Sequence, residues 1–275
     1  FMVDLVRVID FDGCRDSPGF VKHEASLDKR RVSFVFARRI RRLVGRRKLG
    51  VAWLVLDPIF YSLIYLFVLT VVRTSPDPRI LFIGVSMFRI FSSSFKSGTV
   101  SVSDFSGGIK AERVRTRVIT TSMLKFRLLD SLIQSSGIAL ILVLLDVTLY
   151  GTLVFVALSV IMAVLAEGVG LNLGLLIRKI PDLNNVINSY MMLLLFFGSP
   201  AFYSMTITTG YHYKINEYNP FAYFVEAVRY FCGTDSEILE LLGLNMSVVV
   251  LVVIALGVRG YLILDRHRWE ESYWS

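Results

Sequence analysis

The sequence predicts an all-α, polytopic membrane protein with six transmembrane helices, an amphipathic interfacial helix before them, and both termini in the cytoplasm. Hydrophobic residues make up 54% of the 275 residues and charged residues 19%, whereas soluble domains carry nearer a quarter charged residues. Several apolar stretches reach the length of about 20 residues that a helix needs to cross the hydrocarbon core. Basic residues lie beside these stretches, as they do on the cytoplasmic side of membrane proteins.

Residues 36–50 predict a helix that lies in the headgroup layer. Phe36, Ile40 and Val44 recur at the spacing of one helical face, which enters the lipid while the opposite face meets phosphates. Basic residues fill the other positions: Arg38, Arg39, Arg41, Arg42, Arg46, Arg47 and Lys48. Residues 1–35 mix acids, bases and glycine without an apolar run, so we expect a cytoplasmic lead-in and not a signal peptide.

Six apolar stretches follow in order. We expect a transmembrane domain over 51–265, a cytoplasmic tail at 266–275, and spans at about 51–72, 80–97, 127–149, 152–177, 184–203 and 241–264. Tyr150 and Gly151 mark an expected tight turn between the third and fourth spans. The second span is unusually polar because it holds Arg89 and three consecutive serines. The segment 204–240 is expected to lie outside the cell.

The distribution of basic residues sets the orientation. The segments expected on the cytoplasmic side are 1–50, 98–127, 178–183 and 259–275. Together they hold 24 of the 30 Lys and Arg residues. Because the basic residues flank apolar spans and do not form a surface patch, we expect no nucleic-acid partner. Cys14 and Cys232 fall on opposite sides of this topology and are expected to be free thiols, and the three isolated histidines predict no metal site.

Five short motifs now point to a family. In order they are RRKLG at 46–50 with Trp53 and Asp57-Pro58, GGIK at 107–110, RKIPDL at 178–183, GSPAFY at 198–203, and NPF at 219–221 followed by EAVRY at 226–230. This series over about 36–270 resembles the membrane subunit of ABC-2 type exporters, in particular the permeases for polysaccharide, O-antigen, capsule and teichoic acid. The resemblance implies a homodimer in the plasma membrane, working with two P-loop ATPase subunits on a lipid-linked polymer.

The chain has no GxxxxGK[ST] string with which to hold nucleotide phosphates. ATP and Mg are therefore expected on the partner ATPase, with no cofactor on this chain, which is not expected to be an enzyme. Three candidate contacts with substrate or lipid lie at the start of the first span: Arg46, Arg47 and Lys48. They bind either membrane lipid phosphates or the diphosphate of a lipid-linked substrate, because arginine holds phosphate bidentately.

Aromatic side chains in the first two spans are further candidates for the substrate pathway, because sugars stack on ring faces. These are Tyr61, Tyr65, Phe88 and Phe91, and the alternative is that they face lipid. Arg89 and Glu167 are ionisable residues inside spans at similar expected depth. We expect an ion pair between the second and fourth spans, or a position lining the channel. Gly170 and Gly174 form a small-xxx-small step for close helix packing.

Two further segments have roles that rest on the resemblance. The inner loops supply candidate ATPase contacts, the alternative being plain cytoplasmic loops: Asp104, Lys110, Glu112, Arg113, Arg178, Lys179, Pro181 and Asp182. An outer gate helix, or an ordinary interfacial helix, is expected after Asn219, which caps it, with Pro220 at its first position. Phe221, Glu226 and Arg229 belong to it.

Two other functions stay open. An ABC-2 exporter of drugs or small lipids has the same general organisation. An ion-coupled secondary transporter is a different class, in which Glu167 or Asp130 would titrate.

Overall fold

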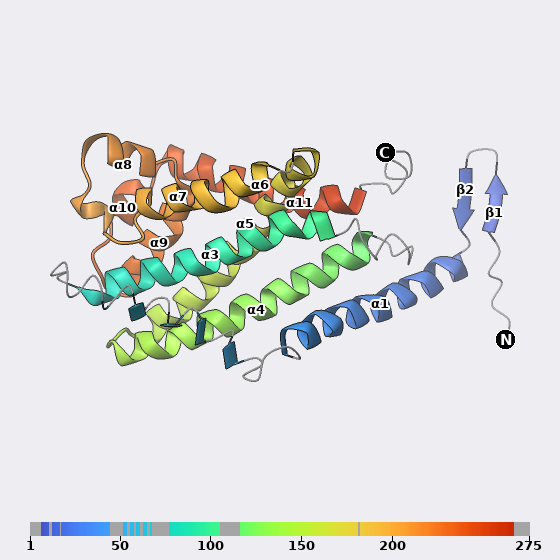
Figure 1. Cartoon of the computed structure of the whole chain (residues 1–275), viewed down its shortest axis with the longest axis horizontal. Helices are drawn as coiled ribbons and strands as arrows, with labels where there is room; N and C mark the ends of the chain where they lie inside the picture. The colour runs from blue at the N-terminus through green and yellow to red at the C-terminus, as the bar shows by residue number, and fades with distance from the viewer. Residues whose placement is uncertain are drawn as a thin grey trace.

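The computed structural model describes residues 7–10, 13–16, 18–44, 77–104, 116–180 and 182–266, together with residues 52, 53, 56, 57, 59, 60, 63, 64 and 67. A short antiparallel hairpin comes first, with β1 (Arg7–Asp10) pairing β2 (Gly13–Asp16) so that Arg7 lies opposite Asp16. Apart from this hairpin, the described part of the chain is helical, as expected (Figure 1).

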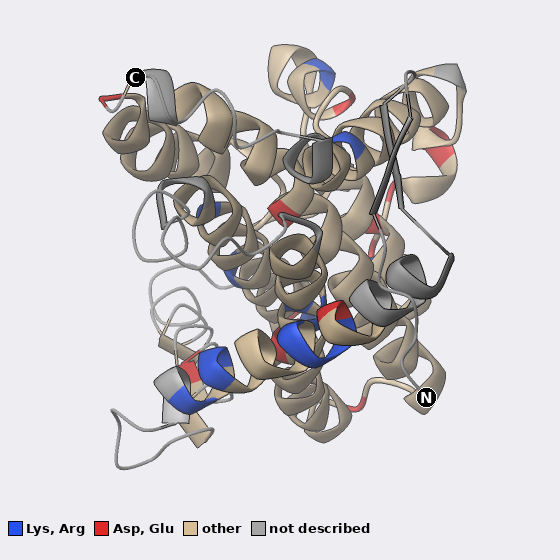
Figure 2. Cartoon of the chain, turned by 90° about the vertical axis from the view of Figure 1, so that its right-hand side faces the viewer, with Lys and Arg blue, Asp and Glu red and all other residues tan. Residues whose placement is uncertain are grey.

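The basic helix is longer than expected. Helix α1 (Pro18–Val44) begins at Pro18 and not near residue 36, because proline suits the first position of a helix. Basic residues recur along it (Figure 2). Helix α1 packs beside α4, where the guanidinium of Arg39 lies 5.9 Å from the ring centre of Phe126. Residues 45–50 lie outside the described part.

Four described helices are long and apolar enough to cross a membrane. They are α3 (Pro78–Asp104), α4 (Thr116–Leu144), α5 (Leu149–Lys179) and α11 (Leu244–Arg266). These helices correspond to the expected second, third, fourth and sixth spans. The first expected span lies mostly outside the described residues, although the nine positions described there are helical.

The turn between α4 and α5 lies earlier than expected, at residues 145–148. Asp146 adopts a positive φ of 59°, and Thr148 caps α5 by accepting the amide proton of Gly151 at 3.1 Å. Gly151 lies in the first turn of α5. A residue without a side chain is needed at this position because the end of another helix packs on it. A Cβ there would lie 2.5 Å from the carbonyl oxygen of Phe231.

The expected fifth span is a shorter helix with an irregular middle. It runs through α6 (Leu183–Asn185), the π-helical turn η1 (Val186–Met191) and α7 (Met192–Gly198). It ends at Gly198 and not near residue 203, because Pro200 disfavours helical geometry in the residue before it. Ser199 is accordingly extended, with φ −93° and ψ 163°.

The chain then forms a compact cap of short elements before α11. These are η2 (Met205–Ile207), α8 (Gly210–Asn216), α9 (Pro220–Phe231) and α10 (Ile238–Leu241). The cap, the start of α3 and the α4–α5 turn lie at one end of the bundle, which we call the cap end (Figure 1). The end of α3, the start of α4, the end of α5 and the end of α11 lie at the other, which we call the basic end.

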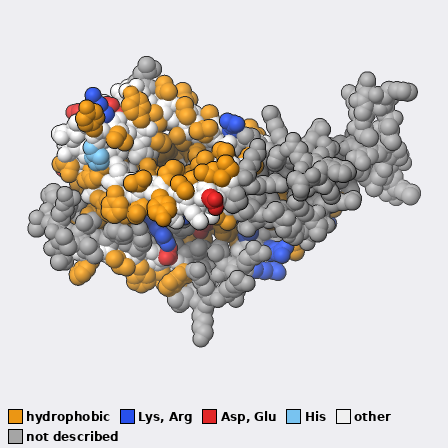
Figure 3. Space-filling view, turned by 45° about the horizontal axis from the view of Figure 1, so that its top comes forward, with side chains coloured by type: hydrophobic (Ala, Val, Ile, Leu, Met, Phe, Trp, Pro, Cys, Tyr) orange, Lys and Arg blue, Asp and Glu red, His pale blue; other side chains and the backbone are white. Residues whose placement is uncertain are grey.

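Helix α3 occupies the centre of the bundle. In its apolar stretch 72% of the residues are buried, against 11% in α11, and α3 contacts α4, α5 and α9. The main core joins its Phe82, Met87 and Phe88 to side chains of α4, α5, α7 and α9. The surface of the described helices is largely hydrophobic (Figure 3), as lipid contact requires.

Candidate functional site

A buried ionic network lies in the half of the bundle nearer the basic end. Nη1 of Arg127 on α4 donates to Oδ2 of Asp130 at 2.8 Å, and its Nη2 donates to Oε1 of Glu167 on α5 at 3.3 Å. The side chains of Arg127 and Glu167 are only 3% and 0% exposed. Because removing a charge from water is costly, these groups are stable there only as a paired set.

Two hydroxyl groups extend this network to four helices. Ser97 on α3 donates to Oε1 of Glu167 at 3.2 Å, and Tyr261 on α11 donates to Oε2 at 2.9 Å. Sequence reasoning missed Arg127 because the charge count assigns it to the inner segment 98–127, whereas α4 begins at Thr116. The spacing of Arg127 and Asp130, one helical turn apart, was the available signal.

The expected ion pair between Arg89 and Glu167 is wrong. Arg89 instead pairs with Asp57, whose Oδ2 lies 2.6 Å from its Nη2, and the partner of Glu167 is Arg127. Similar depth along two helices does not decide a pairing, because the faces that the helices turn toward each other also matter.

The aromatic candidates separate into core and partly exposed residues. Phe88 is 5% exposed, and its ring centre lies 4.6 Å from that of Phe196 and 5.4 Å from that of Phe221. Phe88 is therefore a core residue and not a wall of a pathway. Phe91 is partly exposed and also contacts the ring of Phe221, at 5.4 Å. Tyr61 and Tyr65 lie outside the described residues.

Helix α9 has the expected start. The Asn219 side chain accepts the amide proton of Phe221 at 3.1 Å, and Pro220 occupies the first turn. The helix is largely buried, and both Glu226 and Arg229 are 0% exposed. This burial departs from an ordinary interfacial helix, which keeps its polar face in water.

Arg229 and Glu226 together hold the cap to the bundle. Nη1 of Arg229 donates to Glu226 Oε1 and to the carbonyl of Tyr203, both at 2.8 Å, and its Nη2 donates to the carbonyl of Ile80 at 2.8 Å. Glu226 accepts the amide protons of Met205 at 3.3 Å and Glu237 at 3.1 Å. These bonds join α9 to the start of α3 and to the segments on either side.

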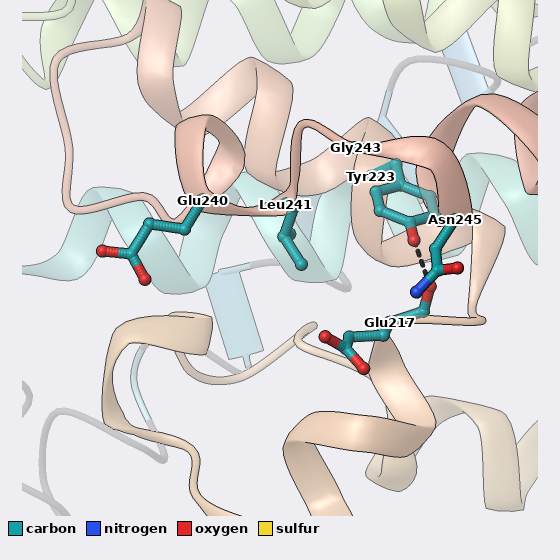
Figure 4. Close-up of a pocket in the computed structure, with 6 residues that line it drawn as sticks. All are labelled: Glu217, Tyr223, Glu240, Leu241, Gly243 and Asn245. Atoms are coloured by element: carbon teal, nitrogen blue, oxygen red, sulfur yellow. Dashed lines mark hydrogen bonds between the residues drawn. The ribbon is translucent and has the colours of Figure 1, made fainter.

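The cap also holds a small acidic pocket of about 170 Å³ (Figure 4). Its lining residues come from the cap and the start of α11: Glu217, Tyr223, Glu240, Leu241, Gly243 and Asn245. Partial burial and the neighbouring carboxylates of Glu240 and Glu226 raise the pKa of nearby Glu237. Among the described residues, no group of three or more His, Cys, Asp or Glu side chains is placed to hold a metal ion.

One comparison with known proteins decides the family. Residues 30–231 match the ABC-2 type transporter family, and this stretch runs from the second half of α1 to the end of α9. The chain belongs to the ABC-2 type transporter family. It is the membrane component of an exporter, and ATP hydrolysis takes place on a separate ATPase subunit. A comparison with curated proteins found no match.

The described candidates for ATPase contact in this ABC-2 transporter lie at the basic end. Asp104 ends α3, Arg178 and Lys179 end α5, and Asp182 precedes α6 with an exposed side chain. The other candidates lie outside the described residues: Lys110, Glu112, Arg113 and Pro181, and at the first span Arg46, Arg47 and Lys48.

Proposed function

We propose that this ABC-2 transporter exports a lipid-linked polysaccharide or a similar cell-surface polymer across the plasma membrane, as a homodimer beside two ATPase subunits. The family match over residues 30–231 carries the transport function. The polymer class is supported by the run of motifs from RRKLG to EAVRY and by the basic residues before the first span, which suit a diphosphate-linked substrate.

The cap also supports a polymer exporter. Between the end of α7 at Gly198 and the start of α11 at Leu244, the chain forms short helices packed on the bundle and no large outer domain. Exporters of drugs or small lipids usually carry such a domain or a different second span. The family match also disfavours an ion-coupled carrier, and Glu167 and Asp130 are both bonded to Arg127.

The basic end is the proposed docking surface for the ATPase. ATP and Mg bind to that partner, and its closure pushes on the segments 104–117 and 178–183. A channel between two copies of the permease then opens alternately to the two sides. The end of α3, the start of α4 and the end of α5, which flank these segments, lie at one end of the bundle, and this supports the arrangement (Figure 1).

Stimulation of ATP hydrolysis tests the substrate class. The permease–ATPase complex is placed in nanodiscs, and its hydrolysis rate is measured with a polyprenyl-diphosphate oligosaccharide, with amphipathic cations and with short-chain lipids. The proposal predicts stimulation by the oligosaccharide conjugate alone. Stimulation by the cations or short-chain lipids, with none by the conjugate, would place the protein among exporters of small molecules.

Loop variants test the docking surface. The double variant Arg178→Glu with Lys179→Glu is expected to lose co-purification of the ATPase, because two basic side chains at the basic end become acidic. Lys214→Glu is the matched control, since Lys214 is exposed on α8 at the opposite end. Equal ATPase recovery with both variants would remove the 178–183 segment from the interface.

A further inference from the structure

The ion pair between Arg89 and Asp57 differs from the buried ion pairs of the bundle because it is accessible. The side chains of Arg89 and Asp57 are 35% and 46% exposed. Among the described residues, Asp57 accepts one hydrogen bond, from Nη2 of Arg89 at 2.6 Å. An ionised carboxylate has about four acceptor sites, so the accessible part of Asp57 requires water.

Arg89 lies near the middle of the apolar stretch of α3. The apolar stretch of α3 runs over Pro78–Ser101, and Arg89 lies about 16 Å along the helix from its start and about 18 Å from its end. The hydrocarbon core is about 30 Å thick. Both ends of the apolar stretch are therefore far from the guanidinium group.

A lipid-facing position does not fit such a pair. A charge at the centre of a membrane helix costs about 2.5–3.5 kcal/mol on insertion scales. Arginine lowers this cost by extending its side chain toward the headgroups, but here the guanidinium is held by Asp57. The short aspartate side chain has no comparable reach. We therefore expect the accessible face of the pair to contact water.

The rest of α3 shows where that water enters. Residues 80–88 are buried without exception, and beyond them the accessible positions are Arg89, Phe91, Ser93, Lys96, Ser97 and Val100. Arg89, Ser93, Lys96 and Val100 recur at the spacing of one helical face, with Ser97 beside them, whereas Phe91 lies on another face. Three of the four are polar or basic, and the row leads from the middle of the apolar stretch to the basic end. A polar, accessible stripe on a helix whose other faces are mostly buried is typical of a water-filled path.

We propose that Arg89, Ser93 and Lys96 line an aqueous path that opens at the basic end and stops at the Arg89–Asp57 pair. The path attracts anions, and Arg89 binds the phosphate-bearing group of the transported molecule, which displaces Asp57 from it. Arginine suits this role because its guanidinium pairs bidentately with phosphate oxygens. The identity of the anion rests on the proposed function above, whereas the aqueous path does not.

Thiol labelling tests the path without substrate or ATPase. Ser93→Cys is made in a Cys14→Ser background and treated with membrane-impermeant methanethiosulfonates from the side of the basic end. Leu132→Cys and Val252→Cys are matched controls, because both residues are exposed, apolar and near the middle of their helices, α4 and α11. The proposal predicts labelling of Ser93→Cys and of neither control. A Ser93→Cys protein that stays unlabelled when folded, and is labelled only after unfolding in detergent, would overturn it.

The charge of the reagent tests the anion preference. An anionic sulfonatoethyl reagent should modify Ser93→Cys at least about threefold faster than a cationic trimethylammonium reagent, after correction for their rates with a free thiol. Arg89→Gln should lower this preference, and so should the exchanged pair Asp57→Arg with Arg89→Asp, which keeps the ion pair if the single variant fails to fold. A preference that both changes leave undiminished would overturn the role of Arg89. If the transported molecule is not a polymer, all these labelling results are still expected.

Discussion

At the scale of residues, burial divides the ionisable groups of this permease into two kinds. Arg127, Glu167, Glu226 and Arg229 are almost completely buried and bonded in two sets. Arg89 and Asp57 remain accessible. The buried sets hold helices in place, because removing one partner leaves a charge without compensation, at a cost of about 3–5 kcal/mol. The accessible pair is less constrained by burial, and we propose above that it meets a phosphate-bearing ligand.

Loss of the arginine and loss of a carboxylate from the buried network should lower stability by different amounts. Arg127→Met should destabilise the protein strongly, because Asp130 and Glu167 both lose their cation. Glu167→Gln should cost less, since Arg127 keeps Asp130 and the amide oxygen still accepts hydrogen bonds. Thermal unfolding in detergent measures the difference, with Lys125→Met as the control because Lys125 is exposed on the same helix. Equal losses for Arg127→Met and Lys125→Met would contradict the network.

The Cys232 thiol should be inert in the folded protein. Burial raises its pKa to about 11, although Arg79 nearby lowers it. Because the pKa is raised, the thiolate is scarce below that pH, and at pH 8 only about one thiol in a thousand is ionised. We expect no maleimide labelling of Cys232 at pH 8 in a Cys14→Ser variant, and complete labelling after unfolding. Rapid labelling of the native protein would show that the site between α5 and α9 is open.

At the scale of elements, glycines fix the closest helix crossings. A Cβ at Gly98 on α3 would lie 2.3 Å from the carbonyl oxygen of Glu167, and one at Gly170 on α5 would lie 2.4 Å from that of Phe95. Both distances are shorter than any real contact, and in each case the obstacle is backbone. The α3–α5 crossing therefore requires glycine on both helices, which agrees with the packing role expected for Gly170.

Gly170→Ala should accordingly lower stability by about 1–3 kcal/mol, the usual cost of overpacking. The matched variant is Gly198→Ala, because a Cβ at Gly198 meets nothing within 4 Å. The midpoints of thermal unfolding of the two variants, each measured against the parent protein, give the comparison. A Gly170→Ala protein as stable as Gly198→Ala would show that α3 and α5 lie further apart than described.

Local signals in the sequence were sufficient for some elements and insufficient for others. The start of α9 was predictable because Asn219 and Pro220 are strong signals at adjacent positions. The start of α4 was not, because Thr116 is polar and apolar content alone places the helix later. The Arg89–Glu167 pairing failed for another reason, since a sequence gives depth along a helix but not which helices face each other.

At the scale of the whole molecule, the cap and the bundle form one unit. Arg229 contacts the carbonyls of both Ile80 on α3 and Tyr203 in the cap, and the end of α9 packs on Gly151 of α5. These contacts tie α9 to both α3 and α5. That α9 acts as an outer gate helix stays a prediction.

Loss of Arg229 should release the cap. Arg229→Met removes three hydrogen bonds and leaves Glu226 buried without its cation. Local opening of the cap becomes easier as a result. Limited proteolysis should therefore cut residues 199–243 at least about tenfold faster. Arg79→Met is the control, because Arg79 is partly exposed and pairs with Asp77 beside the cap. Similar protection in both variants would mean that Arg229 does not hold the cap.

We propose that this ABC-2 permease moves a lipid-linked polymer with energy from a partner ATPase. The most direct measurement is transport in liposomes that contain the permease–ATPase complex and a fluorescent polyprenyl-diphosphate oligosaccharide, with transferred sugar detected by an impermeant lectin. Transfer should require ATP, stop with vanadate and continue with an uncoupler. Transfer that resists vanadate but collapses with the uncoupler, or no transfer of the conjugate by an ATPase-active complex, would contradict this function.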